Sequence, residues 1–308
     1  MEFSKNPKTF DIKSKQLITK INYNHILIIL CLLELDDGRL VSGSGDFNII
    51  VYNKITFKPD IIIKEHKKPI KCLIKTNSNK IISCSDGIKI FKIKHNFYEI
   101  LQILDNYKSL VYKIIELKNK NLISGSNSII FFSKNNDNDE YKKYYEIKLD
   151  ENIECHSIIQ TKETEICYSE FRKKETECIV FYDLIEKKIK SSIYDIKISG
   201  KPFNMITKDL LICGGIDQLY IINVNKYIMI RIVKIDNHGW YNGFCMLNEN
   251  MFLTGSSDGI IRQWKIKGDD INLISKKENA HYFSIYDIIK LKNGNIASCS
   301  GDHTIKIW

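Results

Sequence analysis

The C-terminal stretch NIASCSGDHTIKIW (295–308) recurs, with substitutions, along the whole chain. A short strand rich in Ile, Leu or Val leads into a turn of Ser, Gly, Asp or Asn, and a second strand follows. The other copies are MFLTGSSDGIIRQW (251–264), RLVSGSGDFNIIVY (39–52), KIISCSDGIKIF (80–91), NLISGSNSIIFF (121–132), LLICGGIDQLYII (210–222) and, with a longer turn, EICYSEFRKKETECIVFY (165–182). Successive copies end roughly 43 residues apart on average, which indicates a repeat protein of seven similar units.

The units are predicted to contain strands alone, because no stretch of about 12 residues shows convincing helical periodicity. Segments such as HILIILCLLEL (25–35) are apolar nearly throughout instead of alternating. A strand of this kind needs cover on both faces of its sheet. Sheets packed side by side around an axis give that cover, so the sequence predicts an all-β ring.

These repeats resemble those of the WD40-repeat β-propeller family, over essentially the whole chain. The resemblance implies one domain, 1–308, with seven four-stranded antiparallel blades and a ring closed by the N-terminal strand. The expected blades cover approximately 22–64, 65–104, 105–149, 150–195, 196–235, 236–276 and 277–308, and 1–21 is the closing outer strand of the last blade. Closure would remove sheet edges that could pair with other chains.

A set of four residues carries most of the resemblance: a His before the first strand, a Ser or Thr on the second, an Asp in the next turn and a Trp on the third. The matching residues are His25, Ser42 and Asp46 in blade one; His66, Ser83 and Asp86 in blade two; His238, Thr254, Asp258 and Trp264 in blade six; and His281, Ser298, Asp302 and Trp308 in blade seven. The spacing from His to Asp is 20 or 21 residues in all four. The resemblance implies a buried hydrogen-bonded network in each of these blades.

The chain departs from the family pattern in several places. Tyr52 and Phe91 replace Trp in blades one and two, and a Phe ring cannot donate a hydrogen bond. Blades three to five lack the His, and none of the set's His residues follows Gly as is usual in the family. We therefore expect blades three to five to depend more on apolar packing.

Composition excludes several other classes of protein. With 44% hydrophobic residues, 4 Pro and 15 Gly, the chain is neither disordered nor collagen-like. Its longest apolar run, 26–33, is far shorter than the roughly 20 residues of a membrane-spanning helix, and its first ten residues do not form a secretory signal. Nine Cys without a Cys-x-x-Cys pair indicate neither a disulfide framework nor a zinc site. We expect a soluble protein of a reducing compartment, the cytoplasm.

The net charge of +9 leaves two interpretations open. A basic protein can bind RNA, a phosphoinositide membrane or another anionic surface. However, only four of the cations are Arg, the residue that specific phosphate recognition usually needs, and an A/T-biased coding sequence would give the same excess of Lys, Ile and Asn.

Catalytic and metal-binding motifs are missing from the sequence, which contains no P-loop, G-x-S-x-G or H-E-x-x-H pattern. Cys84 and Cys299 occupy a repeat position held elsewhere by Gly, so small size explains them better than reactivity does. The FRKK stretch (171–174) matches only half of a Phe/Leu-Arg-Arg-Gly phosphoinositide motif, and NNDNDE (135–140) resembles a calcium loop in composition only. We predict no catalytic activity, no cofactor and no metal.

Contact positions follow from the resemblance, because ligands of such propellers usually touch residues that flank the start of each inner strand. The corresponding candidate protein-binding face comprises Leu30, Lys71, Tyr112, His156, Phe203, Trp240, Asn242, Ser284 and Tyr286. Trp, Tyr and Phe on a rigid surface often dominate protein interfaces. We therefore predict a scaffold or adaptor that binds other proteins or peptides and neither nucleic acid nor membrane. The alternatives are binding of an anionic surface and catalysis in the central funnel; the partner, the pathway and the oligomeric state stay open.

Overall fold

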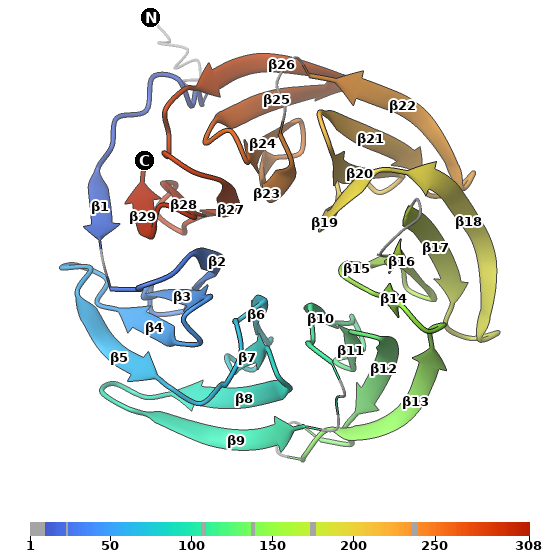
Figure 1. Cartoon of the computed structure of the whole chain (residues 1–308), viewed down its shortest axis with the longest axis horizontal. Coiled ribbons are helices and arrows are strands. Elements are labelled where there is room, and N and C mark those ends of the chain that lie inside the picture. Colours follow the sequence, from blue (N-terminus) through green and yellow to red (C-terminus); the bar gives the residue numbers. More distant parts are fainter. Residues whose placement is uncertain are drawn as a thin grey trace, which may run out of the picture.

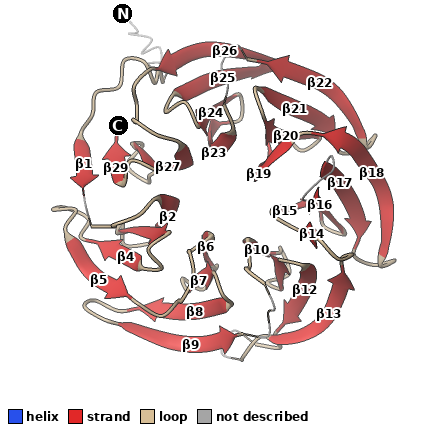
Figure 2. Cartoon of the chain, viewed as in Figure 1, coloured by secondary structure: helices blue, strands red, loops and turns tan. Residues whose placement is uncertain are grey.

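The computed structural model describes residues 10–22, 24–105, 107, 109–136, 139–172, 177–235 and 239–308. These residues form strands, turns and loops without a helix (Figure 2). The strands make seven antiparallel sheets arranged as blades around one axis, with the first strand of each blade innermost (Figure 1). The predicted all-β ring of seven blades is confirmed.

The first three blades are regular four-stranded sheets whose strands pair in chain order. Blade one holds β2 (Ile29–Glu34), β3 (Leu40–Ser44), β4 (Ile49–Tyr52) and β5 (Pro59–Ile63). Blade two holds β6 (Cys72–Lys75), β7 (Ile81–Cys84), β8 (Ile88–Ile93) and β9 (Tyr98–Leu104). Blade three holds β10 (Lys113–Glu116), β11 (Leu122–Gly125), β12 (Ser128–Ser133) and β13 (Lys142–Lys148).

Blade four differs because its inner strand is divided into two pieces that both pair with the second strand. It holds β14 (Ile153–Glu154), β15 (Ile158–Lys162), β16 (Glu165–Arg172), β17 (Glu177–Asp183) and β18 (Lys188–Ile196). Blade five holds β19 (Ile198–Met205), β20 (Leu210–Gly215), β21 (Gln218–Asn223) and β22 (Ile228–Lys234). Blade six holds β23 (Tyr241–Asn248), β24 (Met251–Ser256), β25 (Ile261–Lys267) and β26 (Asp270–Lys277).

Blade seven is assembled from both ends of the chain. Its strands β27 (Ile285–Lys290), β28 (Ile296–Ser300) and β29 (Thr304–Ile307) come from the C-terminal part, and β1 (Thr19–Asn22) pairs antiparallel with β29 as the outer strand (Figure 1). Ile21 of β1 packs into the apolar core between blades seven and one. This pairing gives the closure by an N-terminal strand that the resemblance predicts.

The segment that precedes β1 adds a second attachment, which reaches blade six. Ile12 is completely buried in the core between blades six and seven. The buried side chain of Gln263 accepts a hydrogen bond from the Ile12 N–H (2.8 Å) and donates one to the Phe10 carbonyl (2.7 Å). The N-terminal segment therefore joins blades six, seven and one.

Apolar residues between neighbouring blades make up the core. Between blades one and two, for example, Val41 and Val51 share a buried cluster with Ile70 and Phe91. The blades approach each other closely on the second strand, where a Cβ added at Gly43 would lie 2.6 Å from Cγ2 of Ile70. Cys84 and Cys299 take the same place in their ladders, opposite Cys72 and Asp287, and both are buried. The geometry shows why this position needs a small residue.

Candidate protein-binding face

One side of the ring, which we call the top face, carries the loops that lead into the inner strands and the turns between second and third strands. This follows from the antiparallel order of every blade, which returns the chain to the same side before each new blade begins. The described His residues of the predicted networks belong to these loops, and the predicted contact residues lie at or near the start of the inner strands, except Phe203, which lies well inside β19. The chemistry of the top face therefore depends on what holds those loops in place.

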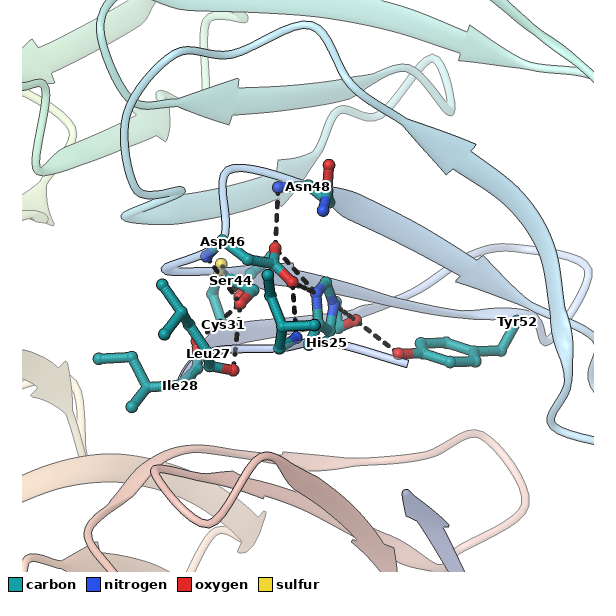
Figure 3. Close-up of polar contacts among 11 residues, drawn as sticks. His25, Leu27, Ile28, Cys31, Ser44, Asp46, Asn48 and Tyr52 are labelled. Carbon is teal, nitrogen blue, oxygen red and sulfur yellow. Dashed lines mark hydrogen bonds and ion pairs between the residues drawn. The ribbon is translucent and has the colours of Figure 1, made fainter. Parts of the chain in front are cut away.

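In blade one, a buried network holds the loop before β2 (Figure 3). Nδ1 of His25 lies 2.9 Å from Oδ2 of Asp46, and Nε2 lies 2.7 Å from Oγ of Ser42, which in turn lies 3.0 Å from the Tyr52 hydroxyl. Asp46 also accepts hydrogen bonds from the backbone N–H groups of Ile26 and Asn48, each 3.0 Å long. Burial alone would raise the pKa of Asp46, but the hydrogen bond and attraction to His25 leave it below its usual value. Tyr52 fills the place of the family's Trp.

In blade two, the corresponding network contains one residue fewer. His66 contacts Asp86 and Ser83, each at 2.6 Å, and Phe91 contributes only its buried ring. Burial lowers the pKa of His66, an effect that its contact with Asp86 opposes only in part.

Blade seven has the complete network. His281 lies 2.9 Å from Asp302 and 2.8 Å from Ser298, and Nε1 of Trp308 donates a 2.9 Å hydrogen bond to the same Ser hydroxyl. Burial lowers the pKa of His281, so the imidazole is held neutral beside a carboxylate.

Blade six is stabilised in a way that the sequence pattern did not reveal. Trp264 donates a 2.9 Å hydrogen bond to Thr254 as the pattern implies, whereas His238 lies outside the described residues. Asp258 binds the almost fully buried guanidinium of Arg262 at 2.5 Å, and Arg262 also contacts Ser256 at 2.6 Å. An Arg four residues after the turn Asp was the only signal in the sequence.

Blade three also has a substitute for the missing His. The hydroxyl of Tyr107 lies 2.6 Å from Oγ of Ser124, and the two residues are 17 positions apart. The His and Ser of blades one, two and seven have the same separation of 17. Burial raises the pKa of Tyr107. The lack of a His in blade three, from which we expected a greater dependence on apolar packing, is thus offset by a hydrogen bond from Tyr107.

The inner strands surround a central cavity of about 150 Å³. Six of the nine predicted contact residues line it: Leu30, Lys71, Tyr112, His156, Asn242 and Tyr286. Leu30, Asn242 and Tyr286 each lie at a register shift between two paired residues, as in a β-bulge. A bulge redirects a side chain and leaves it outside the ladder. The cavity is therefore lined by residues from all seven blades, with Asn204 contributed by blade five.

Aromatic and charged groups form one wall of the cavity. The Tyr112 hydroxyl donates a 2.9 Å hydrogen bond to Glu154, and Nε2 of His156 lies 3.1 Å from the same carboxylate. The His156 ring lies 4.0 Å from the Tyr112 ring and is stacked on Phe171 at 4.7 Å. Burial and the neighbouring carboxylate raise the pKa of Tyr112, which keeps its hydroxyl protonated.

The remaining three predicted contact residues do not line the cavity. Phe203 is only 4% exposed and packs in the core between blades four and five, so its assignment to the accessible face was wrong. Successive side chains of a strand point to opposite faces, and the next residue, Asn204, lines the cavity instead. Trp240 is half exposed, and Ser284 is partly buried, its carbonyl accepting a hydrogen bond from Gly301.

Other functional candidates from the sequence gain little support. Phe171 packs on His156 and Arg172 pairs with Glu170 at 3.3 Å, while 173–176 lie outside the described residues. In the acidic turn, the backbone N–H of Asn136 donates to Asp139, and 137–138 are not described. Within the described part of the chain, no cluster of three or more His, Cys, Asp or Glu could hold a metal ion. The described residues contain no helix, and so none that is long and apolar enough to cross a membrane.

Two comparisons with known proteins bear on this architecture. The repeat family described as "WD domain, G-beta repeat" matches residues 275–308. The chain is also similar to "Ribosome biogenesis protein YTM1" of Vanderwaltozyma polyspora, with 22% identity over 119 residues. That match covers 37% of this chain and 25% of the relative, so the aligned part spans only about a quarter of the relative's length.

Proposed function

We propose that this chain, a WD40-repeat propeller as its repeat match and seven-bladed ring support, is a non-catalytic scaffold that binds other proteins or peptides. Propellers of this repeat family generally act as scaffolds. The binding site that we propose is the top face together with the mouth of the central cavity. The chain would then act as an adaptor that presents one rigid surface to its partners.

The observation that carries this proposal is the convergence of seven blades on one small cavity beside a half-exposed Trp240. Its volume, about 150 Å³, lies below the roughly 300–1,000 Å³ of typical small-molecule and cofactor pockets. The cavity is suited to a single inserted side chain. Tyr112, Tyr286 and Trp240 are held on strands or on loops tied to strands, which limits the entropy lost on binding.

The charges of the cavity favour a peptide over a phosphate. Lys71 and Lys113 share its wall with Asp287, and Glu154 accepts the hydrogen bond of the lining residue Tyr112. A phosphate site would concentrate positive charge, whereas mixed charge suits a polypeptide with polar groups of both kinds. Binding of RNA or of a phosphoinositide membrane is the alternative, and it would weaken steeply between low and physiological salt.

The proposed location is the cytoplasm, in accord with nine buried cysteines that form no disulfide with one another in the described chain. The relative's name makes ribosome biogenesis one setting in which such a scaffold could work. Imaging of a fluorescent fusion tests the location. Sedimentation of the tagged protein with ribosomal particles in a sucrose gradient tests the setting, and a protein found only in the light fractions would argue against it.

The proposal is tested by comparing partners captured by three forms of the protein. The face variant carries Trp240→Ala and Tyr286→Ala, and the control carries Ile55→Ala and Ile185→Ala, two residues at least 73% exposed in turns on the opposite side of the ring. Quantitative mass spectrometry should show proteins that the wild type and the control retain and the face variant loses. Equal retention by all three forms would show that the top face is not the binding site.

A further inference from the structure

Five large apolar side chains are exposed where blades seven and one meet on the top face. Tyr282 is 83% exposed and Phe283 64%, in the loop before β27; Ile26 is 76% exposed and Leu27 46%, in the loop before β2; and Phe47, in the turn after β3, is 39% exposed. We call these residues, with Ile28 between them, the seam patch. None of the five was among the predicted contact residues.

The seam patch is continuous across the two blades. A Cβ added at Gly301 would lie 3.4 Å from Phe283, 3.5 Å from Tyr286 and 3.6 Å from Ile28. A Cβ added at Gly45 would lie 3.1 Å from Ile28 and 3.6 Å from Leu27. Ile28 therefore bridges the apolar residues of the two loops. Tyr286 also lines the central cavity, so the seam patch and the cavity form one surface.

The repeats themselves show that the fold does not require apolar residues here. In blade two the two residues after the His are Lys67 and Lys68, and both are exposed. The backbone there is the same: the N–H after the His donates to the turn Asp at 3.0 Å in blade one, 3.1 Å in blade two and 3.2 Å in blade seven. Two Lys fit the same backbone conformation in blade two. This conformation therefore does not explain why blades one and seven carry apolar pairs.

Hydrogen bonds hold the backbone of the seam patch in place. Oγ of Ser44 donates to the carbonyl of Ile28 (2.8 Å), and Oγ of Ser300 donates to the carbonyl of Phe283 (3.0 Å). Exposed apolar side chains on a rigid backbone lose little conformational entropy when they are covered. Contiguous exposed apolar surface of this kind typically marks an interaction site.

The charges beside the seam patch indicate what its partner carries. The turn residues Asp46 and Asp302 have side chains only 1% and 6% exposed, and each is paired with a buried His. Their negative charge is therefore shielded from a partner. The adjoining blade presents the exposed Lys67 and Lys68. Lys306 lies near the Tyr282 ring, but it is only 7% exposed and donates to the Ala280 carbonyl, so its charge is shielded as well. The apolar surface is thus bordered by exposed positive charge on the side of blade two.

We propose that the seam patch is the anchoring site for a segment of another protein in which apolar residues are flanked by Asp or Glu. The inference rests on the proposed function and specifies where on the top face the partner binds and what its chemistry is. A protein segment is favoured over a membrane because the seam patch continues into the central cavity through Tyr286, where a side chain fits and a flat bilayer does not. Complementary charge at the border would add specificity and speed of association.

The test uses a random library of 16-residue peptides displayed on phage and selected on the immobilised wild-type protein. Two seam variants transplant the blade-two pair: Ile26→Lys with Leu27→Lys, and Tyr282→Lys with Phe283→Lys. Because Lys67 and Lys68 already occupy the equivalent loop positions in blade two, both variants should melt at the wild-type temperature. The control variant carries Ile55→Lys and Ile185→Lys, which add the same charge on the opposite side of the ring.

We expect the selected peptides to combine apolar residues with an excess of Asp and Glu. In fluorescence polarisation they should bind each seam variant at least tenfold more weakly than the wild type and bind the control variant with unchanged affinity. Peptides without an acidic excess, or with unchanged affinity for folded seam variants, would overturn the inference. So would the failure to select any peptide when vesicles of phosphatidylcholine and phosphatidylserine bind the wild type and not the seam variants.

The same peptides separate this inference from the broader proposal. If they lose affinity for the Trp240→Ala and Tyr286→Ala variant and keep it for both seam variants, the top face binds protein and the seam patch is not the anchor. If no top-face variant changes the affinity of any selected peptide, both proposals fail.

Discussion

Replacing Ile12 with Ala should destabilise the whole ring, although this residue lies outside every blade. The Ile12 side chain is fully buried among Leu253, Ile285 and Trp308, in the core between blades six and seven. Truncating a buried Ile to Ala costs about 2–5 kcal/mol, because the transfer free energy of the lost methyl groups is added to the cost of the cavity that they leave. We expect a loss of about 3 kcal/mol, since the hydrogen bonds of Gln263 to the backbones of Ile12 and Phe10 persist in the variant.

The free energy of unfolding can be measured in urea, with the fluorescence of Trp308 as a probe in the same core. The matched control is Ile18→Ala in the same segment, which removes a side chain that is 57% exposed and should change stability by no more than about 0.5 kcal/mol. If the two substitutions cost the same, the N-terminal segment does not hold blades six and seven together and our account of ring closure is wrong.

Three further outcomes follow from the closure and the buried networks. Deletion of 1–20 should cause aggregation or a large fall in melting temperature, because it removes Ile12 and half of β1; a melting curve and light scattering identical to those of the wild type would contradict this. Tyr107→His should keep the network of blade three, whereas Tyr107→Phe should lose about 1 kcal/mol in urea unfolding because the 2.6 Å hydrogen bond between the Tyr107 and Ser124 hydroxyls is lost and Ser124 keeps only its longer contact with the Ile130 carbonyl; equal stability of Tyr107→Phe and the wild type would show that the lost hydrogen bond contributes nothing. Acidification should lower the urea midpoint: His66 and His281 have a lowered pKa in the folded chain, so below the unfolded value of 6.5 the unfolded chain binds protons that the folded chain does not. Below the unfolded value of 3.8, the lowered pKa of Asp46 and Asp86 should add to this loss, and a midpoint that rises between pH 7 and 5 would refute the assignment.

The sequence was sufficient for the architecture because the information is repeated. A period of roughly 43 residues with a fixed strand–turn–strand order leaves few folds other than a propeller, and an error in one unit is corrected by the others. The residues of the networks in blades one, two and seven could be named for the same reason, since their spacings recur.

The features that the sequence did not predict lie outside the repeated set of His, Ser or Thr, Asp and Trp. Tyr107 replaces an imidazole with a phenol at the same position, and Arg262 brings a buried cation to Asp258. Lys89 and Lys306 take the ladder position of Arg262 in blades two and seven, so a cation recurs there, but its role was not evident from the sequence. Phe203 was misplaced because blade five has an irregular pairing of β19 with β20, and one position along a strand decides between core and surface. The seam patch was missed because consecutive apolar residues in a short loop look like the beginning of a strand until their exposure is known.

The assembly of blade seven from two distant segments constrains how the protein is made by the ribosome. The strand β1 is synthesised long before its partner β29, because the strands of blades one to six and two strands of blade seven lie between them in the chain. At roughly 5–20 residues per second, the interval is on the order of 15–60 s. During this time Ile12 and Ile21 have no core to enter, although the earlier blades can already pack on one another. The nascent chain therefore carries an unpaired β1 while the intervening blades are made, and the ring can close only after β29 has emerged.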